Sequence, residues 1–255
     1  MTTKYLSVVA GTICMALLVI PGNPSVNHQY PKGFTVDRIL QKDDSAYSIY
    51  LTIDDGPSET SMYIDSVASA ERAKINVFLV GSNISGRLLY KNNSFIEIGN
   101  HSYLHADGHY RAYYRNAGKV LHDFEHNAVV LSVANKIARL PGRNTWRMQG
   151  RKQTDLVDAN NAGDSLAAAG FRLFGWDLEW RCYPGTDTVQ SAALIMHRIE
   201  KVTAAKNSFT PGHLVILCHE KMFACAHNKQ ELARLIRMIN DKKGYRLQWL
   251  SKYPS

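Results

Sequence analysis

The chain has 255 residues, 45% of them hydrophobic and 20% charged, and this balance excludes a protein that is disordered throughout. Its length allows one large domain or two small ones. The formal net charge of +8 favours anionic partners, namely nucleic acid, acidic membranes or acidic cell-envelope polymers, without choosing among them. Because the sequence shows no nucleic-acid-binding motif, nucleic acid is not an expected partner.

The first predicted element is an uncharged apolar run over residues 5–20, preceded by a lysine and followed by two prolines and a glycine. This order is typical of a secretory signal peptide or an N-terminal anchor. The run is slightly short for a membrane span, and no clear cleavage site follows it. We expect residues 1–22 to direct export, to the periplasm or to an anchored position at the outer face of the inner membrane. Residues 23–46 are expected to form a linker.

From residue 47 onward, strand-like runs alternate with segments of helical spacing. The strand-like runs are YSIYLTID, INVFLVG, FIEIGNH, KIARLPG, RLFGWDLE, HLVILCH and YRLQWLS. The helical segments include residues 62–70, 118–134, 154–169, 189–204 and 229–240. Alternation of this kind predicts a parallel sheet. Seven units in about 200 residues favour one α/β barrel-like domain over residues 47–255.

Polar and reactive side chains fall at the carboxyl ends of the predicted strands. They are Asp54, Asp55, His101, Arg139, Asp177, Glu179 and His219. In barrels of parallel strands, the loops at this end carry the active site. The first two acids are adjacent, and we expect the turn at Gly56 and Pro57 to let both face one cleft.

His101 and His105 are four residues apart, a spacing that places two side chains on one face of a helix. With an acid from another strand end, they form a set of two histidines and one carboxylate with open coordination positions. This set fits a catalytic zinc that keeps a water ligand, and it also fits non-haem iron. The second acid can serve as a base, a backbone N–H near Gly142 can stabilise an oxyanion, and His219 can protonate a leaving amine.

At these positions the chain resembles polysaccharide deacetylases of the NodB-homology type, carbohydrate esterase family 4. The matching motifs are TIDDGP, HSYLH, RLP at residues 139–141 and LCH at residues 217–219, and the resemblance runs from about Ser48 to the C-terminus. It implies a distorted (β/α) barrel, in agreement with the count of about seven parallel strands. It also implies a hydrolase of non-peptide carbon–nitrogen bonds, which removes N-acetyl groups from amino sugars of an envelope or extracellular polysaccharide and releases acetate.

The resemblance implies roles for individual residues of the first three motifs. Asp55, His101 and His105 match the metal ligands, with zinc the expected ion and other divalent ions left open. Asp54 matches the catalytic base that takes a proton from the attacking water, and Arg139 matches the arginine that orients this base. The substrate is then an N-acetylated glycan, with peptidoglycan, chitooligosaccharide and poly-N-acetylglucosamine all left open.

The later motifs supply the remaining catalytic and substrate-binding positions. His219 matches the general acid that protonates the leaving nitrogen, and Leu217 matches the apolar wall that receives the acetyl methyl group. After RLP many relatives carry an aromatic residue, whereas here Gly142 and Arg143 follow, and we expect this departure either to widen the cleft or to change the subsite. Gly142 has no side chain, so the turn after Arg139 can present its backbone N–H to the oxyanion.

The fourth motif departs from the family pattern. Relatives place an aspartate just before a tryptophan, whereas WDLEW has Glu179 before Trp180 and Asp177 two residues earlier. Either acid can support His219, and Asp177 is the one we assign to the catalytic group. Trp180 is expected to line the pocket.

Two further clusters lie beside the expected site. The aromatic cluster, a candidate platform for sugar rings, consists of Tyr110, Tyr113 and Tyr114. The basic cluster recurs every four residues, as on one helix face, and consists of Arg143, Arg147 and Arg151. We expect the basic cluster to contact an acidic glycan, with a solvated charged face as the alternative.

The cysteines outside the N-terminal run have no CxxC spacing, so we do not expect a cysteine metal site. Cys182 and Cys225 fall in predicted loops, where one disulfide between them is compatible with export. Cys218 lies within a strand pattern and is expected to be a buried thiol.

Competing functions use the same residues differently. A catalytically silent glycan-binding protein would be expected to lack a ligand or the acid, and neither is missing. An iron oxygenase would use the same three ligands, and metal analysis would separate it from a hydrolase. The sequence gives no indication of the oligomeric state.

Overall fold

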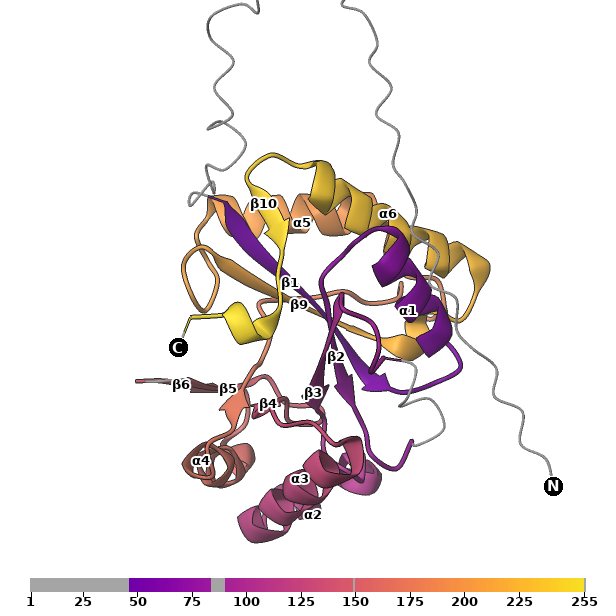
Figure 1. Cartoon of the computed structure of the whole chain (residues 1–255). Helices are drawn as coiled ribbons and strands as arrows, with labels where there is room; N and C mark the ends of the chain where they lie inside the picture. The colour runs from indigo at the N-terminus through magenta and orange to yellow at the C-terminus, as the bar shows by residue number, and fades with distance from the viewer. Residues whose placement is uncertain (1–45, 84–89, 149, 255) are drawn as a thin grey trace, which may run out of the picture. The chain divides into compact units, whose positions relative to one another are not determined.

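The computed structural model describes residues 46–83, 90–148 and 150–254, and Figure 1 shows their arrangement. The expected signal or anchor over residues 1–22 lies outside this part of the chain, as does the linker up to residue 45. No helix in the described ranges combines the length with the apolar character that a membrane crossing requires.

The strands of the described chain include every run that the sequence predicts. They are β1 (Tyr47–Gly56), β2 (Ile75–Leu79), β3 (Ile96–Asn100), β4 (Ile137–Ala138), β5 (Thr145–Met148), β6 (Arg151–Thr154), β7 (Arg172–Leu173), β8 (Leu178–Glu179), β9 (His213–His219) and β10 (Tyr245–Leu247). The run RLFGWDLE divides into β7 and β8. The hairpin β5–β6 is not among the predicted strands, because it falls where the arginine spacing indicated a helix.

The helices also follow the predicted order. The α-helices are α1 (Ser61–Ala70), α2 (Tyr110–Tyr114), α3 (Ala117–Leu131), α4 (Asn160–Ala168), α5 (Ala192–Ala204) and α6 (Ala226–Asp241). The 3-10 helices are η3 (His105–Gly108), η4 (Val157–Ala159), η5 (Glu220–Phe223) and η6 (Leu250–Lys252). The turn η5 directly follows β9, and η3 begins at His105, a few residues after the end of β3.

All strands join one sheet in the order β6-β5-β7-β4-β3-β2-β1-β9-β8, and β10 pairs with β1. Every pair from β7 to β8 along this order is parallel. Only β5 runs antiparallel, to both of its neighbours β6 and β7. The carboxyl ends of the parallel strands therefore meet at one edge, which is where the sequence placed its reactive residues.

Residue alternation along β1 separates a helix-facing side from an interior side. Ile49, Leu51 and Ile53 pack in the cluster that includes α1, α5 and α6, whereas Tyr50 packs in a separate interior cluster. Because successive side chains point to opposite faces, Asp54 at the end of β1 shares the interior side with Tyr50. The same alternation holds for β9, which places Leu217 and His219 on the interior side.

Two groups of helices cover different parts of the sheet (Figure 1). Buried residues of α1, α5 and α6 pack on β1, β2 and β9, and buried residues of α3 and α4 pack on β4 and β7. The amphipathic spacing of these helices thus buries one face of each.

Residues 174–177, here named the closing segment, connect β7 to β8, two strands that lie far apart in the sheet order. The backbone N–H of Phe174 donates to the carbonyl of Ala138 on β4 at 2.9 Å, and that of Asp177 donates to the carbonyl of Val215 on β9 at 2.9 Å. The closing segment therefore bridges two strands that are separated in the sheet by β3, β2 and β1. This bridge curls the sheet toward a barrel.

Candidate metal and catalytic site

The end of β1 brings two adjacent carboxylates to one place through an unusual backbone angle. Asp55 has φ of +67°, a left-handed value that non-glycine residues seldom adopt. The register with β2 shifts between Ile53 and Gly56, so the alternation of the strand is interrupted here. The turn that we expected from Gly56 and Pro57 thus begins one residue earlier, at Asp55 itself.

A buried carboxylate that the sequence reasoning missed supports this turn. Glu220, the residue after His219, is fully buried and accepts hydrogen bonds from the hydroxyls of Ser58 (2.6 Å), Ser61 (2.8 Å) and Tyr90 (2.6 Å). A Cβ atom at Gly56 would lie 2.0 Å from Glu220 Oε1, so the carboxylate occupies the space that any side chain would need. Burial raises the pKa of Glu220 above its ordinary value despite these donors.

His101 and His105 converge through a loop rather than along a helix. His101 directly follows β3, and both Ser102 (φ +67°) and His105 (φ +52°) have left-handed backbone angles. The two imidazole rings nevertheless lie with their centroids 5.0 Å apart. The helical spacing that we inferred for the pair was wrong, because the left-handed residues fold the loop back on itself.

The histidine loop is held by a carboxylate on α3. Oδ2 of Asp123 accepts the backbone N–H of Tyr103 at 3.2 Å and that of Leu104 at 3.5 Å, and it also accepts the hydroxyl of Tyr113 at 2.8 Å. Asp123 lies one helix away from the motifs, so no motif signal could have identified it.

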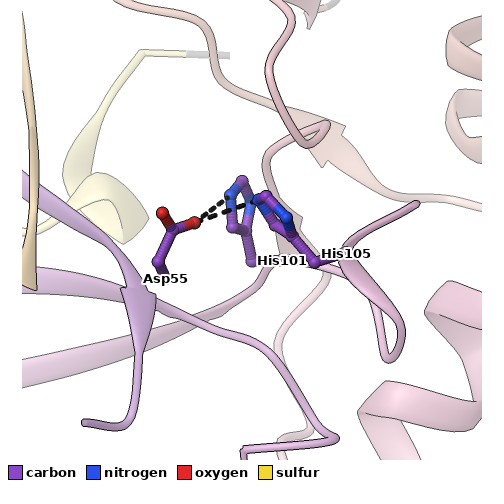
Figure 2. A group of neighbouring side chains, drawn as sticks. All are labelled: Asp55, His101 and His105. Carbon is purple, nitrogen blue, oxygen red and sulfur yellow. Dashed lines mark ion pairs between the residues drawn. The ribbon is translucent and has the colours of Figure 1, made fainter. Parts of the chain in front are cut away.

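The side chains of Asp55, His101 and His105 point toward a common centre, as Figure 2 shows. Oδ1 of Asp55 lies 3.0 Å from Nε2 of His105 and 3.3 Å from Nε2 of His101. One ligand atom from each residue lies within 4.8 Å of the others. This cluster is the candidate metal site, and its donors are of the types that bind zinc and similar ions.

The hydrogen bonding of His101 fits metal ligation. Its Nδ1–H donates to the carbonyl of Arg139 at 2.9 Å, which leaves Nε2 with its lone pair toward the centre. Burial opposes ionisation of Asp55, but the adjacent imidazoles of His101 and His105 together outweigh burial and hold the pKa of Asp55 well below its ordinary value. An ionised carboxylate and an oriented imidazole are the forms in which these groups bind a cation.

Asp54 is buried beside the metal cluster and is oriented by Arg139. Nη1 of Arg139 donates to Oδ1 of Asp54 at 2.8 Å and to Oγ1 of Thr52 at 2.6 Å. The same guanidinium donates to the carbonyls of Phe174 (3.0 Å) and Gly175 (2.8 Å) in the closing segment. Because Oδ1 of Asp54 is taken by arginine, Oδ2 is left toward the centre, 3.6 Å from Nε2 of His101.

A cleft of about 300 Å³ opens over these groups. Its lining residues are Asp54, Asp55, His101, His105, Tyr110, Gly142, Trp176, Glu179, Arg181, Leu217 and His219. Asp54 and His219 are register partners on the neighbouring strands β1 and β9, and Thr52 pairs with Leu217 in the same register. The cleft thus brings together nine of the residues that the sequence singled out, including Glu179. Arg139 does not line the cleft but contacts Asp54.

Gly142 lies at the rim of this cleft with φ of +63°. A Cβ atom there would lie 3.1 Å from Cε1 of Tyr110, so a larger residue would press on that ring. Tyr110 in turn packs edge-on against His105, with ring centroids 5.9 Å apart. The glycine therefore leaves its backbone accessible to the cleft beside the histidine loop.

The fourth motif is distributed differently from the prediction. Oδ1 and Oδ2 of Asp177 accept the backbone N–H groups of Phe209 (2.6 Å) and Val215 (2.8 Å), and Asp177 does not line the cleft. Burial raises the pKa of Asp177 to about 6. Glu179 does line the cleft with His219, and its carboxylate is paired with Arg181. The structure places Glu179, rather than Asp177, beside the expected general acid.

Trp180 lies in the core and not in the cleft, which corrects our expectation. It is fully buried, packs edge-on against Phe223, and donates its Nε1–H to the carbonyl of Gln190 at 2.8 Å. Trp176 of the closing segment lines the cleft instead. Strand alternation accounts for the difference, because Glu179 faces the cleft and its neighbour Trp180 must then face the other side.

The aromatic cluster contributes one residue to the cleft. The hydroxyl of Tyr114 donates to the carbonyl of Pro141, and Tyr114 is buried, whereas Tyr113 is bound to Asp123. Tyr110 alone of the three lines the cleft.

The basic cluster that we expected on a helix is divided by the β5–β6 hairpin. Arg147 is buried and pairs with Asp164 at 2.6 Å. Arg151 packs over the ring of Phe209. Only Arg143 remains near the cleft, so the predicted stripe was wrong.

The cysteines are free in the described chain, including Cys182 and Cys225, so the disulfide that we considered is not formed in this structure. Cys218 is fully buried, as its strand position predicted.

Together, the curled parallel sheet and the cleft at its strand ends define a barrel of the polysaccharide-deacetylase type with a candidate Asp-His-His metal site. Residues 41–141 match the family described as polysaccharide deacetylase, and this range contains the motifs TIDDGP, HSYLH and RLP. Over these residues the chain is similar to polysaccharide deacetylases, and the solved structures of this type confirm the predicted distorted barrel. No curated protein sequence matches the chain significantly.

Solved structures share this fold at low sequence identity. A carbohydrate esterase family 4 enzyme from Streptococcus mutans is 18% identical, with a TM-score of 0.59 over 84% of this chain and 91% of the other. The catalytic domain of a peptidoglycan N-acetylglucosamine deacetylase from Eubacterium rectale is 15% identical, with a TM-score of 0.58 over 82% and 92%. A mutant described as a pseudoenzyme of carbohydrate esterase family 4 is 13% identical, with a TM-score of 0.54 over 81% and 67%.

Proposed function

We propose that the protein is a metal-dependent deacetylase that removes N-acetyl groups from the amino sugars of a polysaccharide and releases acetate. The observation that carries this proposal is the convergence in one cleft of the Asp55, His101 and His105 donors with buried Asp54 and with His219. The match of residues 41–141 to the polysaccharide deacetylase family supports the reaction class. The Eubacterium rectale protein with the same fold is named for N-acetylglucosamine, which supports this sugar as the unit that is deacetylated.

Asp55, His101 and His105 are the residues that would hold the metal, and we propose zinc. A divalent ion at this site supplies Lewis-acid activation of water and of the acetamide carbonyl. The chain itself keeps the ligand set in place through the Arg139 carbonyl on His101 and the left-handed backbone of Asp55.

Asp54 acts as the base that takes a proton from the attacking water. Arg139 fixes one oxygen of this carboxylate, and Asp54 and Thr52 both accept hydrogen bonds from its buried guanidinium. A carboxylate that is held in one orientation can receive the proton at a defined atom, Oδ2, without reorganising in the transition state.

Other residues around the cleft serve the leaving group and the acyl group. His219 protonates the departing amine nitrogen, and Leu217, two residues earlier on the same strand face, contacts the acetyl methyl group. The Gly142 backbone N–H stabilises the negative charge on the carbonyl oxygen. The position of each residue around the cleft supports these assignments.

We further propose that the protein is exported and reaches its glycan in the periplasm or while anchored at the outer face of the inner membrane. The support is the apolar run over residues 5–20 with its flanking lysine and prolines. Cell fractionation followed by mass spectrometry of the N-terminus tests this proposal, and an intact chain found only in the cytoplasm would contradict it.

Acetate release is the test of the proposed activity. The full-length protein is incubated with peptidoglycan, chitooligosaccharide and poly-N-acetylglucosamine, each with and without a chelator. We expect release from at least one glycan, loss of release with chelator, and recovery when zinc is added back. If zinc-supplied protein releases no acetate from any of the three, the proposal is wrong.

A second candidate is a glycan-binding protein that is catalytically silent, because the same fold occurs in a pseudoenzyme. This chain retains the ligand set, Asp54 and His219, which favours the enzyme. Binding of a glycan by the zinc-supplied protein, without any acetate release over a prolonged incubation, would support the silent protein instead.

A further inference from the structure

A second hollow lies directly beside the catalytic cleft. It measures about 510 Å³ and is lined by Gly108, His109, Tyr110, Arg111, Ala112, Arg115 and Arg143, which we name the arginine hollow. Tyr110 lines both spaces, and Arg143 is the chain neighbour of Gly142 at the cleft rim. A polymer that leaves the cleft across Tyr110 therefore enters the arginine hollow.

The arginines of this hollow have no carboxylate partners. Arg111, Arg115 and Arg143 form no ion pair with any residue that the structure describes. Buried Arg147 and the cleft residue Arg181 differ in this respect, because each has an acid partner. Three uncompensated cations around one space produce a positive potential that attracts anions.

The position of Arg143 shows that its charge is held and only partly satisfied. Its Nη1 donates to the carbonyl of Gly142 at 2.9 Å, whereas its Nε is buried and has no hydrogen-bond partner among the described residues. Its guanidinium lies over the rings of Tyr110 and Tyr114, at 5.9 and 5.8 Å from their centroids. Stacking of this kind orients the planar group and leaves its remaining donors available to a ligand.

The other two arginines are exposed on α2 and its C-terminal end. Arg111 and Arg115 are four residues apart, so they project from the same side of the helical turn. The neighbouring acids, Asp107 and Asp155, are exposed, and in the described part of the chain neither forms an ion pair with the three arginines. Local acids therefore do not neutralise the arginine hollow.

We propose that the arginine hollow binds a carboxylate on a glycan unit next to the N-acetyl sugar in the cleft, so that the substrate is an anionic amino-sugar polymer. This inference rests on the proposed deacetylase function and names its substrate class. Guanidinium groups pair with carboxylates through two parallel hydrogen bonds, and three such groups beside one aromatic ring suit a charged sugar.

The test compares a neutral substrate with one that carries carboxylates. These are the neutral hexamer of N-acetylglucosamine and the same hexamer carboxymethylated at O6, both given to the zinc-supplied full-length protein at low salt. We expect a higher kcat/KM for the carboxymethylated hexamer. In the double variant Arg111→Gln/Arg115→Gln, the ratio of the two kcat/KM values should fall about fivefold, since exposed charge pairs contribute modestly. The double variant Arg234→Gln/Arg237→Gln on exposed positions of α6 removes the same net charge elsewhere and is the matched control.

An unchanged ratio in the Arg111 and Arg115 variant, or an equal fall in the α6 control, would overturn the inference while leaving the deacetylase activity established. Binding of both hexamers to the Asp54→Asn chain by calorimetry provides a readout that does not depend on turnover. If the wild-type chain releases no acetate, the proposed function fails, and a charge preference in this binding experiment that requires Arg111 and Arg115 still supports the anion site. Equal binding of the two hexamers would overturn it.

Discussion

The two sides of the cleft are built by different means. On the β1–β9 side, Asp54, Leu217 and His219 project from regular strands, and their positions follow from alternation and register. On the other side, His105 begins η3 and Tyr110 begins α2, and the position of His105 depends on left-handed residues and on the loop contacts of Asp123. The comparison teaches that a motif locates a strand residue directly, whereas a loop residue also depends on contacts outside the motif.

Substitutions on the β1–β9 side of the cleft should abolish activity without disturbing the fold. We expect Asp54→Asn to lower acetate release about a thousandfold, because the amide cannot accept the proton while the Arg139 contact can still form through its oxygen. Metal content, measured by mass spectrometry on the purified variant, should stay at the wild-type level. The variant Asp55→Asn is the control, since it should reduce metal content instead, and the opposite pattern would exchange the two roles.

Asp177 in the closing segment should make the free energy of unfolding depend on pH. The pKa of Asp177 is raised by burial from 3.8 to about 6, so the folded chain binds this proton more tightly than the unfolded chain. The resulting stabilisation is fully present below pH 3.8 and is lost as pH rises through 6, by up to about 3 kcal/mol. Denaturant unfolding of wild type and Asp177→Asn, from pH 4 to pH 7, should show the wild-type advantage decreasing. A difference that is independent of pH would contradict this account.

The turn at the end of β1 should be sensitive to the smallest added side chain. Gly56→Ala would place a methyl group 2.0 Å from Glu220 Oε1, and we expect a loss of about 2 kcal/mol in the free energy of unfolding. Combining it with Glu220→Ala tests the cause, because the double variant should lose less than the sum of the two single losses. Additive losses would show that the two residues do not compete for this space.

The loop side should lose metal affinity when its clamp is weakened. Asp123→Asn removes the negative charge that holds the backbone of Tyr103 and Leu104, and we expect about a tenfold weaker metal affinity by competition with a chelating dye. Tyr113→Phe removes only the third donor to the same oxygen and should change the affinity less. Equal affinities in wild type and Asp123→Asn would show that the loop keeps its shape without the clamp.

Sequence reasoning located the strand-borne part of the site because strand ends and residue order define it. The parallel sheet and the residues Asp54, Asp55, His101 and His219 follow from the pattern of apolar runs ending in reactive groups. The loop geometry around His105 did not follow, since four-residue spacing resembles a helix and left-handed angles leave no signal in the sequence. The prediction that Trp180 lines the cleft was wrong, and Trp176 lies there instead. Which tryptophan faces the cleft depends on the side to which the two-residue strand β8 turns each residue.

The contacts of Arg139 join the curvature of the barrel to the orientation of the base. The Arg139 guanidinium donates hydrogen bonds to Asp54 on β1 and to two carbonyls of the closing segment. These two distant parts of the chain are therefore joined through one side chain. Opening of the closing segment would release the arginine and, with it, the carboxylate. On heating, activity should therefore be lost when the closing segment opens, at a lower temperature than the cooperative unfolding of the sheet. Residual activity would then report whether the barrel is closed.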